Sequence, residues 1–247
     1  MHLEEFAEGN SLLHRIDPRI KIITFLIFCS FCSSSNHLKI SFLYLLYGLF
    51  LLVIAKLKLK ALAIRLLAAN FFILFIWIFI PLSHPGNPYF EIGPFKVSLE
   101  GLSLALNITL KCNAIILATL SLLATSNIFS LAHALLHFKV PAKLVTIFFL
   151  FYRYITVMHE EYLQIKRTVV ARGFVSKTNF HTYQTYAYLV GALILKSFER
   201  ADEIYKAMLC RGFKGFFPLL EHFTLKKVDL IFGFLSSLVS ILIWLKI

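Results

Sequence analysis

The sequence predicts an all-α polytopic membrane protein, with about five transmembrane helices and a cytoplasmic domain of long amphipathic helices. Hydrophobic residues make up 59% of the 247 positions, and the mean hydropathy is +0.78. A soluble domain has an apolar share of only about 45–50%. Several apolar runs approach the roughly 20 residues that cross the hydrocarbon core of a bilayer. The basic region 127–227 has only shorter apolar runs, which indicates a part outside the membrane.

Five apolar runs are expected to cross the membrane. The first follows Asp17-Pro18, a pair that suits a helix start because Asp caps free N–H groups and Pro fits the first helical position. The third run is expected to end at Pro81. The runs comprise residues 20–35, 38–55, 64–82, 100–126 and 228–246.

The distribution of basic residues predicts a plasma-membrane topology with a cytoplasmic N-terminus and an external C-terminus. Basic residues mark cytoplasmic loops. The turn 56–65 is therefore placed inside, because it carries Lys56, Lys58, Lys60 and Arg65. Residues 83–99, with Lys96 alone, are placed outside. There the stretch "PYFEIGPFKVS" (88–98) is expected to form a small hairpin around its Gly-Pro pair.

Three parts follow from this topology: residues 1–126 with the first four spans, a cytoplasmic helical domain over 127–227, and the last span in 228–247. The cytoplasmic domain carries 14 Lys and Arg but 6 Asp and Glu, and the whole chain has a net charge of +12. In a soluble protein such a charge would indicate nucleic acid. Here the positive-inside rule accounts for it, so the bilayer is expected as a partner and nucleic acid is not. The domain is expected to contain helices over 128–138, 141–172 and 181–211.

The tripeptide Arg-Gly-Phe occurs twice, at 172–174 and at 211–213, 39 positions apart. Each copy falls where a long helix should end. Glycine after the last helical turn adopts the left-handed conformation readily, and a hydrophobic residue after it closes the cap. A basic residue there also suits the negative end of the helix dipole. A helix cap therefore explains each copy alone, and a contact made twice with a partner is the alternative.

The sequence predicts no enzyme, cofactor or metal site. The interiors of the five spans hold no Asp or Glu, which argues against a proton-coupled carrier. The stretch "GALILKS" (191–197) lacks the second glycine of a phosphate-binding loop and lies in an expected helix. Two pairs have metal-capable spacing, Cys29 with Cys32 and His133 with His137, but neither has further ligands close in sequence.

Span four carries an unusual polar set, Asn107, Lys111 and Asn113. A lysine within a membrane span is costly and usually faces protein or water. Asn107 and Lys111 are four positions apart, so they share one helix face. Two interpretations stay open at this point: hydrogen bonds within the bundle, or contact with a partner membrane subunit.

Three stretches resemble the transmembrane T component of energy-coupling factor (ECF) transporters, and most closely its cobalt-type branch, the CbiQ family. The resemblance covers nearly the whole chain, and its most specific part ends at the second Arg-Gly. The stretches are "SLLHRIDPRIKII" (11–23), "FYRYITVMHEEYLQIKRTVVARGF" (151–174) and "LILKSFERADEIYKAMLCRGFKG" (193–215).

The resemblance implies a coupling subunit of an ATP-driven cobalt importer, which joins two ABC-type ATPase subunits to a small membrane subunit that captures substrate. A nickel or vitamin importer of the same type is the alternative, and a stand-alone secondary carrier is a third. The resemblance further implies that two Ala-Arg-Gly motifs dock on the ATPases. By position these motifs are Ala171, Arg172, Gly173 and Cys210, Arg211, Gly212, so cysteine replaces alanine in the second motif.

Overall fold

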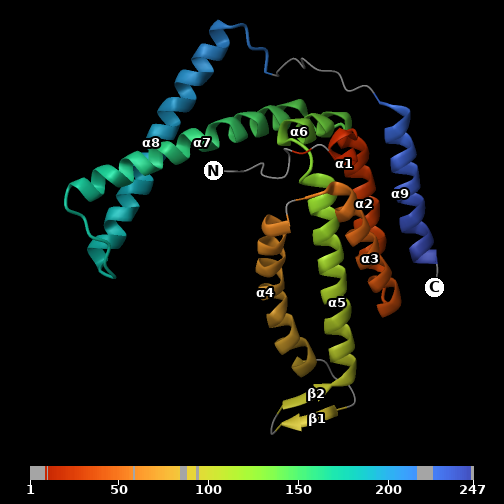
Figure 1. Ribbon diagram of the computed structural model, residues 1–247. Coiled ribbons are helices and arrows are strands. Elements are labelled where there is room, and N and C mark those ends of the chain that lie inside the picture. Colours follow the sequence, from red (N-terminus) through yellow and green to blue (C-terminus); the bar gives the residue numbers. More distant parts are fainter. Residues whose placement is uncertain are drawn as a thin grey trace. The chain divides into compact units, whose positions relative to one another are not determined.

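The computed structural model of the chain describes residues 9, 11–57, 59–83, 88–92, 95–215 and 225–245 (Figure 1). They divide into two compact units, which are considered separately below. The bundle unit comprises the described residues of His2–Ala134 and Phe223–Ile247. The long-helix unit comprises those of Leu135–His222. The predicted class, an all-α polytopic membrane protein, is confirmed.

Helices make up nearly all of the bundle unit. Four of the described helices are long and apolar enough to span a membrane, over Leu38–Ala55, Lys60–Ser83, Leu99–Leu123 and Lys227–Leu245. The first predicted span, residues 20–35, forms the remaining helix, which has 17 residues and is about 25 Å long at 1.5 Å per residue. The elements are α1 (Leu12–Arg15), α2 (Pro18–Ser34), α3 (Leu38–Ala55), α4 (Leu59–Ser83), α5 (Leu99–Ala118), the π-helical turn η1 (Thr119–Leu123) and α9 (Lys227–Leu245).

The predicted start of α2 is confirmed. The Asp17 carboxylate accepts a hydrogen bond from the Arg19 backbone N–H at 2.9 Å, and Pro18 is the first helical residue. The cap satisfies one of the N–H groups that every helix start leaves without an intrahelical partner.

Two expectations about α4 are wrong. The helix begins at Leu59, so Lys60 and Arg65 lie on its first turns and not in a connecting turn. The connection is short because Lys56 takes the left-handed conformation (φ 49°) and ends α3 abruptly. Pro81 lies inside α4, which continues to Ser83. A proline near a helix end removes one backbone hydrogen bond, and here the helix ends two residues later.

The core of the bundle unit lies where α2, α3 and α5 meet. Phe28, Cys32 and Tyr44 are fully or almost fully buried there. Gly48 permits close packing of α3 on α5, because a Cβ atom at this position would lie 3.2 Å from the Ala114 carbonyl oxygen. The Tyr44 hydroxyl donates to the Ser240 carbonyl oxygen at 2.7 Å and so ties α3 to α9.

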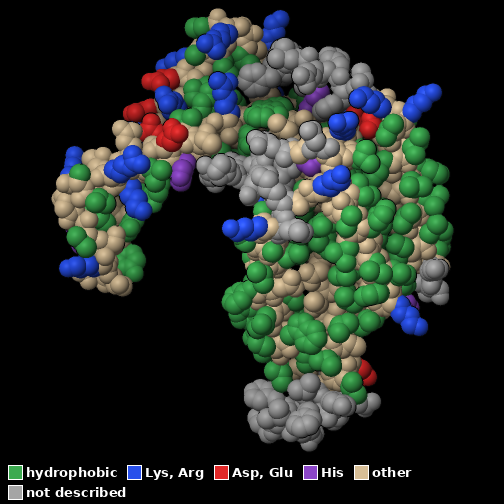
Figure 2. Space-filling view, viewed as in Figure 1, with side chains coloured by type: hydrophobic (Ala, Val, Ile, Leu, Met, Phe, Trp, Pro, Cys, Tyr) green, Lys and Arg blue, Asp and Glu red, His purple; other side chains and the backbone are tan. Residues whose placement is uncertain are grey.

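Apolar side chains gather over the outward faces of the bundle helices (Figure 2). On α4, Leu67, Phe71 and Phe72 are each about 70% exposed. A soluble protein seldom leaves such a surface to water, whereas lipid tails are a favourable environment for it. The exposed faces therefore agree with a membrane bundle.

The predicted hairpin is present as two antiparallel strands, β1 (Pro88–Ile92) and β2 (Phe95–Ser98). Its Gly93-Pro94 pair lies outside the described residues. Ser98 also caps α5, because its hydroxyl accepts a hydrogen bond from the Gly101 N–H at 3.0 Å.

Two helices dominate the long-helix unit, α7 (Ala142–Ala171) and α8 (Phe180–Cys210), and α6 (Ile128–His137) precedes them. All three lie within a few residues of their predicted bounds. The helices α7 and α8 run in roughly opposite directions and cross in the second half of α7 and near the middle of α8 (Figure 1). At the crossing the Lys196 ammonium donates to the Glu161 carboxylate at 2.8 Å, and the Ser197 hydroxyl lies 3.0 Å from the Met158 sulfur. The hydrogen bond from Lys196 holds the pKa of Glu161 below its usual range.

Candidate docking site at the two Arg-Gly helix ends

The first Arg-Gly-Phe forms a complete Schellman cap at the end of α7. Gly173 has φ +84°, the left-handed conformation that glycine adopts without strain. Its N–H donates to the Val170 carbonyl oxygen at 3.0 Å, and the Phe174 N–H donates to the Val169 carbonyl oxygen at 3.4 Å. These are the two hydrogen bonds that define the motif. The cap interpretation is therefore confirmed at this end.

The second Arg-Gly-Phe repeats the same geometry at the end of α8. Gly212 has φ +77°. Its N–H donates to the Leu209 carbonyl oxygen at 2.9 Å, and the Phe213 N–H donates to the Met208 carbonyl oxygen at 3.0 Å. The sequence repeat therefore encodes one local structure twice.

The caps do not by themselves require arginine. Arg172 and Arg211 are the last residues before the glycines, and both are exposed. The backbone hydrogen bonds of the cap involve glycine, phenylalanine and the residues before arginine, so other side chains would fit. A guanidinium offers five donors in a rigid fork and pairs well with carboxylates. Two exposed guanidinium groups on identical caps are suited to two similar acidic contacts.

Each of the two arginines lies at the end of a helical segment that begins at the crossing of α7 and α8, and these two segments are called the arms. Arg172 lies 11 residues beyond Glu161 and Arg211 lies 15 beyond Lys196, which correspond to roughly 16 Å and 22 Å along the helix axes. A displacement at either end therefore acts on the crossing through a rigid helix several turns long. The stretch 191–197, considered above as a phosphate-binding loop, lies in the middle of α8.

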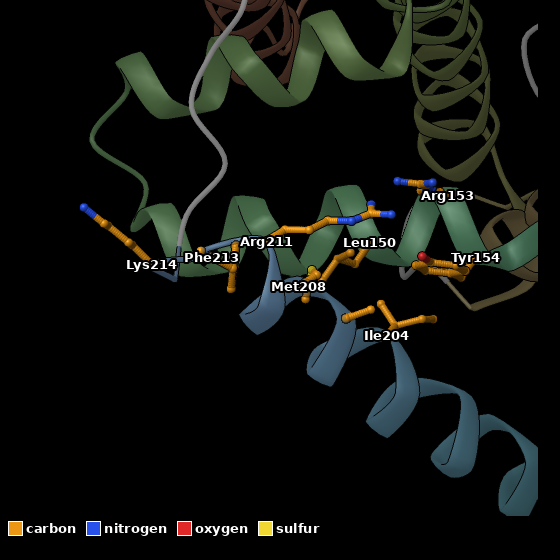
Figure 3. A pocket seen from close by; sticks show the side chains of 10 residues that line it. Leu150, Arg153, Tyr154, Ile204, Met208, Arg211, Phe213 and Lys214 are labelled. Carbon is orange, nitrogen blue, oxygen red and sulfur yellow. The ribbon is translucent and has the colours of Figure 1, made fainter.

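The two ends have different surroundings. At the first end the Phe174 ring packs against Tyr186, with ring centroids 6.0 Å apart. At the second end Phe213 and Arg211 line a cavity of about 720 Å³ between α7 and α8 (Figure 3). Among the described residues, a side chain of α8 thus packs on the first cap, whereas the second cap lines a cavity.

The polar residues of α5 bind neighbouring helices. Asn107 donates from Nδ2 to the Asn36 carbonyl oxygen at 3.2 Å, and Lys111 donates from Nζ to the Ser33 carbonyl oxygen at 3.0 Å. Both acceptors lie at or just after the C-terminal end of α2, where carbonyl groups lack helical partners. Their shared face, predicted from the spacing of four, therefore caps α2.

Asn113 forms a reciprocal amide pair with Asn70 on α4. Each Nδ2 donates to the other Oδ1 at 3.0 Å. Asn113 also donates to the carbonyl oxygen of Thr109, one turn earlier, at 2.9 Å. Hydrogen bonds within the bundle thus account for all three polar residues of the predicted set, and contact with a further subunit stays a prediction.

Sequence reasoning missed a buried cation. The Lys21 side chain is fully buried, and its ammonium donates to the Ser126 hydroxyl at 2.6 Å and to the Thr125 hydroxyl at 3.2 Å. Asp17 and Asp229, both buried, lie close enough to attract its charge. In the sequence Lys21 is one of several basic residues of the N-terminal segment. Its position one turn after the Asp17 cap was the available signal.

Asp229 links the starts of two helices in this cluster. Its carboxylate accepts from the Lys226 N–H at 3.0 Å, which caps α9, and from the Asp17 N–H at 3.4 Å, at the start of α2. The first turns of α2 and α9 and the segment after η1 are therefore joined by residues more than 100 positions apart in sequence.

The Cys29–Cys32 and His133–His137 pairs are not part of a larger ligand cluster among the described residues. Cys32 is buried in the apolar core, Cys210 is exposed at the end of α8, and the four cysteines are free thiols. His133 and His137 both lie on α6, with His133 buried. Within the described ranges, groups of three or more His, Cys, Asp or Glu with metal-binding geometry are absent.

The fold defines a multi-pass helical membrane protein that carries two long crossing helices with matching, arginine-bearing ends. Comparison with known families makes the assignment more specific. Residues 9–222 match the CbiQ family, described as a cobalt transport protein. The chain belongs to this family, which confirms the resemblance drawn from the three sequence stretches.

Two of the similar proteins are named as transmembrane proteins of energy-coupling factor transporters. The chain is 29% identical over 229 residues to the energy-coupling factor transporter transmembrane protein EcfT of Bacillus subtilis, covering 87% of this chain and 85% of that protein. It is 27% identical over 224 residues to EcfT of Streptococcus equi, covering 86% and 83%. It is also 25% identical over 256 residues to the uncharacterized protein MJ1571 of Methanocaldococcus jannaschii, covering 97% and 84%.

Proposed function

We propose that this chain is the membrane coupling subunit of an ATP-driven ECF-type importer, and that its two Arg-Gly helix ends dock on two ABC-type ATPase subunits. The observation that carries the proposal is the repeated cap: two crossing helices end alike, each with an exposed arginine. The family assignment and the names of the similar proteins support it. ATP hydrolysis is assigned to the partners, not to this chain.

The crossing of α7 and α8 suggests how motion would pass through the chain. Each ATPase would hold one arm, and a change in their separation would alter the angle between the helices. Interiors and helix contacts are close-packed and transmit displacement with little compression. A small membrane subunit that captures substrate would receive the motion.

The apolar face of α8 favours such a membrane partner. Ile194, Leu195 and Phe198 are 65%, 62% and 74% exposed, and their spacing puts them on one helix face. Contiguous exposed apolar surface marks a protein or membrane contact. The predicted contact of Asn107, Lys111 and Asn113 with the capture subunit would come in addition to their bonds inside the bundle. If Lys111→Met leaves co-purification of that subunit unchanged, this contact does not exist.

Cobalt is the substrate that we propose, because the family description names cobalt transport. The names of the EcfT relatives specify no substrate, so nickel or a vitamin is the alternative. We further propose the orientation predicted from the basic residues, with the N-terminus and region 127–227 in the cytoplasm and the C-terminus outside.

Co-purification tests the docking directly. The chain would be expressed with its genomic neighbours, as wild type, as Arg172→Ala with Arg211→Ala, and as an Arg200→Ala control that removes an exposed arginine of α8 away from both ends. The double variant should lose the ATPases and metal uptake, while the control keeps both. Full ATPase recovery and uptake in the double variant would falsify the proposal. Uptake of labelled cobalt, nickel and vitamins by the wild-type complex then identifies the substrate.

A further inference from the structure

The space between α7 and α8 differs on the two sides of their crossing. On the side of the connecting segment 172–179, side chains of the chain itself fill it. Phe174 packs edge-on against Tyr186 and lies 6.4 Å from His181, measured between ring centroids. A void of only about 20 Å³ is left there. This void is too small for a side chain from a partner.

On the other side of the crossing the helices diverge and leave a cavity of about 720 Å³. Its size lies within the range of ligand-binding pockets, about 300–1,000 Å³. Both helices contribute to its wall, and the second cap closes one end (Figure 3). The lining residues are Leu150, Arg153, Tyr154, Ile204, Ala207, Met208, Arg211, Gly212, Phe213 and Lys214.

The residues that line the cavity combine apolar surface with positive charge. Leu150, Ile204 and Met208 supply apolar surface, whereas Arg153, Arg211 and Lys214 supply three cations. The ten described lining residues include no carboxylate. In Figure 3 the Arg211 side chain extends along α7 toward Leu150, on the same side as Arg153, and Lys214 points the opposite way. An apolar group with an adjoining negative charge would complement this wall.

We propose that this cavity receives an apolar side chain of one ATPase subunit, and that a neighbouring carboxylate of that subunit binds between Arg211 and Arg153. This inference rests on the proposed function. It adds Arg153 of α7 as a residue that determines docking at the second end. It also makes the two ends unequal: the first presents its arginine on a filled surface, and the second presents an arginine and receives a side chain.

The test compares single variants of the full chain, in lipid nanodiscs, by their affinity for the purified ATPase subunits. Arg153→Glu reverses one charge of the cavity, and Ala207→Phe fills it from an exposed helix position. Lys143→Glu makes the same charge change on α7 outside the cavity. Arg153→Glu and Ala207→Phe should each weaken binding about tenfold or more, the loss expected for one charge-assisted hydrogen bond, while Lys143→Glu should not.

Two further measurements separate the possible outcomes of this experiment. Arg153→Lys keeps the charge and should retain more affinity than Arg153→Glu. Thermal unfolding of each variant would show that the helix pair is intact. If Arg211→Ala weakens binding but Arg153→Glu and Ala207→Phe match Lys143→Glu, the inference is overturned while the proposed function stands. If Arg172→Ala and Arg211→Ala also have no effect, both fail. A loss with Arg153→Glu only in nanodiscs that contain phosphatidylglycerol would assign the cavity to a lipid headgroup and overturn the inference.

Discussion

The bundle unit and the long-helix unit use their polar side chains in opposite ways. In the bundle, Lys21 and Asn113 are held by hydrogen bonds to neighbouring segments. In the long-helix unit, Arg172 and Arg211 are exposed on helix ends whose caps are complete without them. A polar group in apolar surroundings is costly unless it is paired, whereas an exposed cation costs little. Loss of Lys21 or Asn113 should therefore lower stability, whereas loss of Arg172 or Arg211 should affect binding alone.

The largest expected loss of stability follows from removing the buried cation. Lys21→Ala leaves the hydroxyls of Ser126 and Thr125 without their donor and leaves two buried carboxylates without a neighbouring charge. Breaking a buried charged contact from one side costs about 3–5 kcal/mol. We expect a large drop in Tm or in folded yield in detergent. Lys39→Ala, an exposed lysine of α3, is the matched control and should change neither.

The amide pair between α4 and α5 should contribute less. A double-mutant cycle with Asn70→Ala and Asn113→Ala isolates it, because the two side chains bind each other reciprocally. Interhelical hydrogen bonds in membranes average about 0.6 kcal/mol, with a maximum near 1.7. A coupling energy within that range is expected from unfolding in detergent. A coupling of zero would mean that the pair contributes nothing to the bundle.

Substitution of a cap glycine should lower the stability of the long-helix unit. Gly212 has φ +77° with open space around it, so Gly212→Ala is opposed only by backbone strain, about 1 kcal/mol or more. Gly191, in the interior of α8, also has open space but no positive φ, and Gly191→Ala should stabilise the helix by about 0.5–1 kcal/mol. Gly212→Ala should therefore lower Tm, and Gly191→Ala should raise it. Equal shifts would contradict the cap assignment.

The smallest effect on Tm is expected from the ion pair between Lys196 and Glu161, where α7 and α8 cross. Lys196 lowers the pKa of Glu161, so the stabilisation is present above the unfolded carboxyl pKa of about 4.3 and is lost as pH falls through the lower folded pKa. Glu161→Gln should lower Tm slightly at pH 7, and the difference should shrink as the pH falls through the carboxyl range. Both residues are solvent-accessible, and exposed ion pairs contribute little. A Tm difference that grows toward low pH would contradict this sign.

Much of the fold could be predicted from the sequence because its signals are local. Asp17-Pro18 marks a helix start, and each Arg-Gly-Phe marks a helix end, since caps depend on a few adjacent residues. The first and last residues of α4 were harder to predict. A left-handed Lys56 shortens the connection after α3, so that α4 begins at Leu59, and nothing in the side chain of a lysine indicates that conformation.

The site was predictable only in part. Arg172 and Arg211 could be identified because they repeat. Lys21 has a local signal in the Asp17 cap one turn before it, but its partners Thr125 and Ser126 could not be predicted, because they lie more than 100 positions away and the contact depends on tertiary packing. Arg153 was missed for the same reason: it meets Arg211 at one cavity only because α7 and α8 run antiparallel.

Protection of a thiol at each helix end would show whether the two ATPase subunits bind there. Cys210 is an exposed natural probe next to Arg211. Ala171→Cys, in a chain that also carries Cys210→Ala, gives the equivalent probe next to Arg172. Maleimide labelling of each position, located by peptide mass spectrometry, would be followed with and without the two ATPase subunits. The ATPases should slow labelling at both positions, and Arg172→Ala or Arg211→Ala should abolish protection at its own end. Labelling that the bound ATPases leave unchanged at both ends would contradict the proposed docking.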